Sequence, residues 1–224
     1  MDEPKKGFEK IVLPNGLRLV MSHLPAFRSV TVIVLCGAGS RYEKPQTNGV
    51  SHFLEHMFFK GTKKRPTASD ISHTLDAIGA DYNAFTGKET TGYYIKAASQ
   101  HLPLLVELLS DMLWESSFVK TEIEKERGGI IEEINLYEDM PPRRVGEIYE
   151  QLLWDKQPLG WDIGGSKDVI RSLKREDFIN YIGERYVPNN LVVSIAGDFA
   201  RDDALGYVKA HFGKQKGPDV PGFV

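Results

Sequence analysis

Three ionisable side chains stand close together in the apolar segment HFLEHMFF, which covers residues 52–59. His52 and His56 are four positions apart, and Glu55 lies between them. Residues three or four positions apart share one face of a helix, so these side chains would project together. Two imidazoles at this spacing can bind one metal ion, and the metal would satisfy polar groups that are otherwise unfavourable to bury. The segment therefore predicts a metal-binding helix of the inverted zincin pattern, H-x-x-E-H.

A catalytic zinc ion takes three protein ligands, so a third residue must come from elsewhere in the chain. Residues 122–138 form an acidic segment whose isoleucines recur at helical spacing and define a predicted core face. Glu133 falls at the edge of this face, whereas Glu132 falls on the opposite, solvated side. Helical phase therefore favours Glu133 as the third ligand. Glu126 lies two turns earlier on the same stripe, and the remaining glutamates of the segment are less favoured.

The composition excludes several classes of protein. The chain has 224 residues, of which 41% are hydrophobic, and a net charge of −3, which is typical of a globular protein and gives no reason to expect nucleic acid as a partner. No apolar run is long enough to span a membrane, and the N-terminus lacks a signal core. We expect a bacterial-type cytoplasmic location, with a removed targeting sequence as the alternative. Cys36, the single cysteine, is expected in the core.

The elements that must position these residues mix strands with long helices, without regular βαβ alternation. The pattern predicts an α+β fold. Strands are predicted in KIVLPNGLRLVMSH (a hairpin), SVTVIVLC, YNAF, TTGYYIKAAS and NNLVVSIAG. Helices are predicted in the H-x-x-E-H segment, PTASDISHTLDAIGA, much of residues 102–154, KREDFINYIGERY and DDALGYVKAHF.

Several local details are also predicted. Thr47 or Asn48 is expected to cap the H-x-x-E-H helix, which should end at Gly61. The basic residues 63–65 are expected to form a solvated turn. The pair at residues 128–129, two glycines in a helix, suggests close helix packing near the metal.

Five stretches of the sequence together point to a known family. HFLEHMFFKGT, LPNGLRLV, YNAFTGKETTGYY, ERGGIIEEI and RYVPNNLVVSIAGD resemble the pitrilysin-type zinc peptidases, which include insulin-degrading enzyme and the mitochondrial processing peptidase. The resemblance is closest to the processing-peptidase-like branch found in bacteria. It implies a processing-peptidase-like metallohydrolase fold, in which a largely antiparallel sheet packs against helices. Such enzymes have two homologous halves around a chamber, so this chain would be the zinc-bearing half.

The resemblance also implies a role for each residue of the site. His52, His56 and Glu133 would bind one zinc ion, since Glu133 stands at the family's spacing for the third ligand. Glu55 would be the general base that takes a proton from the zinc-bound water. Glu126 matches a second catalytic glutamate, which supports the site without binding the metal.

The strand that contains Asn83, Ala84 and Phe85 matches the family's edge strand, which holds the substrate backbone. The predicted function is therefore that of a zinc metalloendopeptidase acting on short or unfolded peptides. One alternative is a non-catalytic or partner-dependent subunit of a two-chain peptidase or assembly complex. Another is a small-molecule lyase, since a related fold carries the same motif.

The predicted domain covers residues 1–212, and the Gly/Pro-rich residues 213–224 are predicted to be a linker towards a second half. In the family the second half supplies an arginine and a tyrosine that help bind substrate. The expected partners are therefore a peptide substrate and a homologous second half, a separate subunit or a second copy of the chain. The remaining histidines have no partner at ligand spacing and are expected to be structural or on the surface: His23, His73, His101 and His211.

Overall fold

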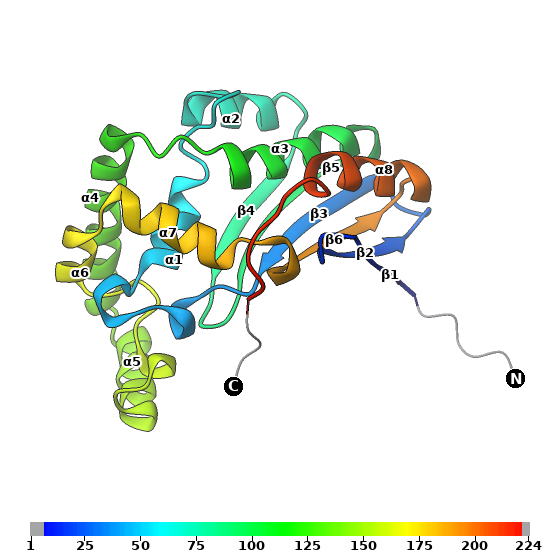
Figure 1. The fold of residues 1–224 in the computed structure, drawn as a ribbon. Coiled ribbons are helices and arrows are strands. Elements are labelled where there is room, and N and C mark those ends of the chain that lie inside the picture. Colours follow the sequence, from blue (N-terminus) through cyan, green and yellow to red (C-terminus); the bar gives the residue numbers. More distant parts are fainter. Residues whose placement is uncertain (1–6, 221–224) are drawn as a thin grey trace, which may run out of the picture.

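A six-stranded sheet lies at the centre of the molecule (Figure 1). The computed structural model describes residues 7–220. Its strands are β1 (Glu9–Val12), β2 (Arg18–His23), β3 (Ser29–Cys36), β4 (Asp81–Thr86), β5 (Thr91–Ala98) and β6 (Leu191–Gly197). They pair in the order β1-β2-β6-β3-β5-β4, and every neighbouring pair is antiparallel except β2 with β6. The predicted fold, a largely antiparallel sheet with helices, is confirmed.

The helices lie mainly on one face and at one end of this sheet (Figure 1). They are α1 (Val50–Met57), α2 (Ala68–Asp76), α3 (Leu102–Glu115), α4 (Lys120–Glu138), α5 (Pro141–Trp154), α6 (Lys167–Ser172), α7 (Arg175–Arg185) and α8 (Arg201–Phe212). Short 3₁₀ helices occur at Ser40–Tyr42, Pro45–Thr47, Ser99–His101, Pro158–Gly160 and Pro188–Asn190. Helix α5 projects from the end near α1 and α4 (Figure 1).

The sheet has one buried face and one partly open face. In β3, Val30, Val32, Val34 and Cys36 are buried, and the residues between them are half-buried. This alternation follows from the period of two of a strand, because alternate side chains point to opposite faces. Each buried valine contributes roughly 1.5–3 kcal/mol. The predicted core position of Cys36 is confirmed.

Helix α1 is held by its apolar side chains. Phe53, Leu54, Met57 and the following Phe58 are all buried, and the ring of Phe58 lies 5.3 Å from that of Tyr93. A helix of eight residues is too short to be stable alone, so this packing is what keeps it helical. The side of α1 that remains carries its histidines and its glutamate.

The predicted start and end of α1 are wrong. Thr47 lies in a 3₁₀ helix, Asn48 is extended, and Gly49 is the N-cap with a φ of 98°. The carboxylate of Glu43, rather than a neighbouring side chain, accepts the first amide hydrogen bonds. The helix ends at Met57 rather than at Gly61. A cap residue usually directly precedes its helix, but the acceptor here, Glu43, lies earlier in the chain.

The basic turn is also only partly as predicted. Lys63 and Lys64 are exposed, with side-chain exposures of 79% and 63%. Arg65 is buried instead, because it forms ion pairs of 2.7 Å with both Glu107 and Asp111 on α3. A run of three charges predicts a solvated loop, but the third one here meets two carboxylates on another element.

The two glycines of α4 do not mediate close packing. Gly128 and Gly129 are exposed, and a Cβ atom on either would meet no described atom within 4 Å. The suggestion that they bring another helix close to the metal is therefore wrong.

Candidate metal centre

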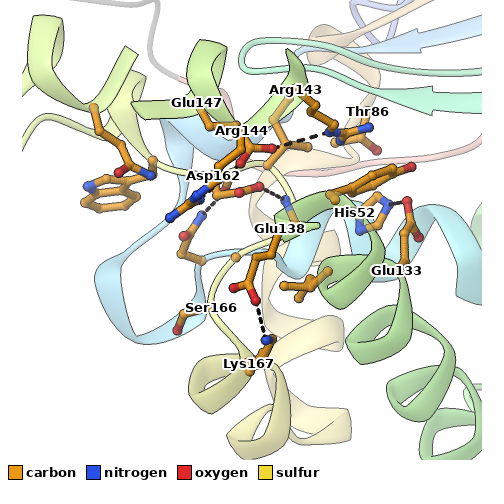
Figure 2. Close-up of a pocket in the computed structure, with 18 of the residues that line it drawn as sticks. His52, Thr86, Glu133, Glu138, Arg143, Arg144, Glu147, Asp162, Ser166 and Lys167 are labelled. Carbon is orange, nitrogen blue, oxygen red and sulfur yellow. Dashed lines mark hydrogen bonds and ion pairs between the residues drawn. The ribbon is translucent and has the colours of Figure 1, made fainter. Parts of the chain in front are cut away.

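Helices α1 and α4 pack against each other and bring the side chains of His52, His56 and Glu133 together. Figure 2 shows two of them, His52 and Glu133. His52 Nε2 lies 3.4 Å from His56 Nε2 and 3.7 Å from Glu133 Oε1. His56 Nε2 lies 3.6 Å from Glu133 Oε2. A tetrahedral zinc ion with bonds of about 2.1 Å separates its ligand atoms by about 3.4 Å. The three side chains therefore fit a zinc ion by chemistry and by spacing.

The environment of His52 favours its neutral form. Burial, together with the nearby charge of His56, lowers the pKa of His52 to about 4. Its Nδ1 atom is buried and has no hydrogen-bond partner among the described residues. Because a histidine must be neutral to bind a metal, this environment prepares the ring for the role of a ligand.

Glu126 contacts His56 from the side opposite Glu133. Its Oε2 atom lies 3.2 Å from His56 Nδ1, and its Oε1 atom lies 2.6 Å from the ammonium group of Lys60. Burial alone would raise the pKa of Glu126, but the contacts with His56 and Lys60 hold it below its usual value. The ionised carboxylate can thus accept a hydrogen bond from Nδ1–H, which leaves the Nε2 lone pair free to bind a metal.

Glu55 lies beside the histidines and contacts the edge of the sheet. Its Oε2 atom accepts a hydrogen bond of 2.6 Å from the hydroxyl of Thr86, at the end of β4. Burial raises the pKa of Glu55, and the hydrogen bond from Thr86 opposes this shift. The sequence carried no signal for Thr86, since the contact depends on how α1 packs against β4.

Of the glutamates on α4, Glu133 and Glu126 reach the histidines. Glu132 is exposed, and its carboxylate accepts a hydrogen bond from Asn135. The other three pair with basic residues instead of the histidines: Glu122 with Lys125, Glu124 with Arg127, and Glu138 with Lys167. The described residues contain no other cluster of histidine, cysteine and carboxylate side chains that could hold a metal ion.

A cavity of about 680 Å³ opens next to the three side chains (Figure 2). His52, Glu55 and Glu133 are among the residues that line it. Phe85 of the predicted substrate strand also lines it. The rest is lined largely by residues that the sequence did not indicate, including Thr86, Tyr137, Arg143, Trp161 and Asp162. Most of them belong to α5 and to the loop after it, whose position depends on tertiary packing. The cavity is large enough to hold several residues of a peptide.

The predicted substrate strand lies at the edge of the sheet. β4 is the last strand in the order, and no described strand pairs with its outer side. Asn83 and Phe85 are exposed, and the amide of Ala84 donates a 2.9 Å hydrogen bond to the Asn83 side chain. The backbone of Ala84 therefore has a donor that is not used in the ladder with β5.

The fold places the chain in a class of solved peptidase structures. A protease from Helicobacter pylori superposes with a TM-score of 0.90 and 26% identity, over 97% of this chain and 52% of that one. A putative M16-like peptidase from Alicyclobacillus acidocaldarius gives a TM-score of 0.85 and 25% identity, over 98% of this chain and 52% of that one.

The sequence comparisons give the family. Residues 18–167 match the family described as "Insulinase (Peptidase family M16)", and residues 172–223 match "Peptidase M16 inactive domain". The chain belongs to the M16 family of peptidases. The resemblance to pitrilysin-type peptidases is confirmed.

Two curated relatives are named as zinc proteases. "Uncharacterized zinc protease YmxG" of Bacillus subtilis is 39% identical over 89% of this chain and 48% of the relative. "Uncharacterized zinc protease ML0855" of Mycobacterium leprae is 37% identical over 93% of this chain and 47% of the relative. The chain thus spans about half the length of the curated relatives it matches. Among the residues that the structure describes, no helix is long and apolar enough to cross a membrane.

Proposed function

We propose that this chain is the zinc-bearing half of a metalloendopeptidase that hydrolyses short or unfolded peptides. The observation that carries the proposal is the convergence of His52, His56 and Glu133, with Glu55 beside them on the same cavity. The names of the relatives and the membership of the M16 family support it.

In this proposal, His52, His56 and Glu133 hold one zinc ion. Zinc bound there would act as a Lewis acid on the scissile carbonyl and would lower the pKa of water. Glu126 holds the ring of His56 by its Nδ1 atom, so that Nε2 keeps its direction towards Glu133.

Glu55 is the proposed general base. The hydroxyl of Thr86 donates a hydrogen bond to Oε2 of Glu55, which leaves Oε1 to take the proton from the attacking water. The same carboxyl then delivers the proton to the leaving amine. The position of Glu55 on the cavity wall supports both steps.

The edge of β4 is the proposed binding site for the peptide backbone. An extended peptide that pairs with β4 would lie along Asn83, Ala84 and Phe85 and would pass Thr86 next to Glu55. The side chain of Asn83 must release the Ala84 amide for this pairing. Most strands of a folded protein are already paired or have protected edges, so the site favours short or unfolded peptides.

A homologous second half or subunit is the proposed partner. The chain covers about half of the relatives, and the solved structures it resembles contain a comparable stretch beyond the match. Helix α5 also exposes apolar side chains at helical spacing, namely Val145, Ile148, Tyr149 and Leu152. The alternative function, a subunit that is active only with its partner, is favoured by the same observation.

The variant Glu55→Gln tests the function. With the second half present, it should retain zinc and lose cleavage of an unstructured peptide by about 10²–10⁴-fold, because the amide cannot take up the proton. Glu132→Gln, a matched change at an exposed glutamate, should keep full activity. Undiminished cleavage by Glu55→Gln would remove Glu55 from the mechanism.

A further inference from the structure

A buried carboxylate, that of Glu43, lies at the start of helix α1, which carries the histidines. Glu43 is only 6% exposed. Its Oε2 atom accepts hydrogen bonds from the backbone of Gly49 at 2.7 Å and from the side chain of Asn48 at 2.8 Å. Its Oε1 atom accepts one from the backbone of Ser51 at 2.8 Å. None of the steps proposed for catalysis uses this residue.

Glu43 does for α1 what a local cap does for other helices. The first amides of a helix have no partner within it, and a side chain just before the helix usually accepts from them. Gly49 stands at that place in α1 and has no side chain to do so. Glu43 accepts from two of these amides with a negative charge, which also interacts favourably with the positive end of the helix.

The same group of residues joins α1 to the cavity wall. Asn48 donates a second hydrogen bond of 3.0 Å to the carbonyl of Asp162, which lines the cavity. Ser51 donates through its hydroxyl to Tyr181 on α7 at 2.8 Å. A Cβ atom on Gly49 would lie 2.6 Å from the carbonyl of Gly164, so the helix start and the loop after α5 touch through their backbones.

The position of these contacts along the helix matters for the site. Ser51, whose amide Glu43 holds, directly precedes His52 in the first turn of α1. Glu55 follows in the next turn. Because α1 has only eight residues, a shift of its first turn moves both side chains relative to Glu133 on α4.

We propose that Glu43 is a positioning residue, which fixes the first turn of α1 and so holds His52 and Glu55 in place against Glu133 and the cavity. The part of the proposal that concerns zinc rests on the proposed function. Burial raises the pKa of Glu43, while the hydrogen bonds from the start of α1 oppose that shift.

The variant Glu43→Gln tests this role. The glutamine is nearly isosteric, but its NH₂ group would face amide donors in place of one carboxylate oxygen. Asp111→Asn is the matched control, because Asp111 is also a buried carboxylate, bound to Arg65 and Thr62, but it lies on α3. Both variants should lower the melting temperature.

Two readouts separate positioning from general stability. In the metal-free chain, hydrogen exchange of the α1 amides should become at least about tenfold faster in Glu43→Gln and stay near the wild-type rate in Asp111→Asn. The zinc dissociation constant, measured against a competing chelator, should rise about tenfold or more in Glu43→Gln only, as is usual when a group that supports a ligand is lost.

Equal exchange and equal zinc affinity in Glu43→Gln and wild type would overturn the proposal, and so would the same changes in Asp111→Asn. If Glu43→Gln does not fold, the variant Asn48→Ala tests the positioning role of Glu43 by the same two measurements. It removes one donor to Glu43 and should give a smaller change in the same direction. A wild-type chain that binds no zinc would contradict the proposed function instead, and the exchange measurement would still decide the role of Glu43.

Discussion

His56 lies between two glutamates of α4, with one of them at each ring nitrogen. Glu126 is 3.2 Å from Nδ1, and Glu133 is 3.6 Å from Nε2. The two glutamates are separated by two helical turns, so a single face of α4 supplies both contacts. This arrangement holds the ring of His56 by both nitrogen atoms, which supports the proposed role of Nε2 as a zinc ligand.

The neighbouring residues Glu132 and Glu133 provide a matched pair of variants. Glu133→Gln should weaken zinc binding by about 10²-fold or more, because a charged ligand is replaced by a neutral amide. Glu132→Gln should leave the affinity unchanged, since its carboxylate is exposed and bonds to Asn135. Competition with a chelator measures both, and the reverse order of affinities would refute the assignment of Glu133.

Glu126→Gln tests the contact with His56. The glutamine oxygen can still accept a hydrogen bond from His56 Nδ1–H, but the variant lacks the negative charge that attracts Lys60 and the proton on Nδ1. Zinc should bind about tenfold more weakly, with one zinc still bound at saturation, because the group only supports a ligand. Complete loss of the zinc site would show that Glu126 is a ligand itself.

The spacing of residues along the sequence is enough to predict much of the candidate site. The periodicity of a helix put Glu55 beside two histidines and separated Glu133 from Glu132, and the structure places all of them accordingly. Thr86 could not be found in this way, because its contact with Glu55 joins a strand to a helix. Such contacts depend on packing between elements, for which a single sequence has no periodic signal.

Among the elements, most strand and helix positions followed from the sequence pattern, but the short helix α6 and the ends of α1 did not. The predicted caps Thr47 and Asn48 are ordinary helix-start residues, yet Gly49 takes that place and Glu43 accepts the hydrogen bonds. Helix ends depend on whichever acceptor reaches the first amides, near or far in the chain. In α1 the chain before the helix places the carboxylate of Glu43 within hydrogen-bond distance of these amides.

The glycines of two helices should respond in opposite ways to alanine. Gly129→Ala should raise the free energy of unfolding by about 0.5–1 kcal/mol, since a Cβ there meets no described atom within 4 Å and alanine favours a helix. Gly49→Ala should destabilise the chain, because Gly49 has a φ of 98° and its Cβ would lie against Gly164. Thermal unfolding measures both, and a stabilised Gly49→Ala would contradict the described start of α1.

At the scale of the whole molecule, the chain holds a complete set of candidate zinc ligands but spans about half the length of its relatives. The partly open face of the sheet, the edge of β4 and the apolar side of α5 are the surfaces that a second half could cover. The boundary near residue 212 and the linker role of the tail stay predictions, and residues 221–224 lie outside the described part of the chain.

Mixing experiments test the role of a second half. The chain alone should bind zinc but cleave an unstructured peptide slowly, and addition of the homologous second half should raise kcat/KM by at least about tenfold, because binding and orientation of the substrate improve. Steady-state cleavage of a fluorogenic peptide measures this. Equal activity with and without the second half would show that one half is sufficient.

The zinc content of the purified chain tests whether His52, His56 and Glu133 form a zinc site. After loading with zinc and dialysis, elemental analysis should find about one zinc ion per wild-type chain and less than about a tenth of that in His52→Ala, which removes one of three ligands. A wild-type chain without zinc, or a His52→Ala variant that keeps a full equivalent, would contradict the assignment of these three residues as ligands.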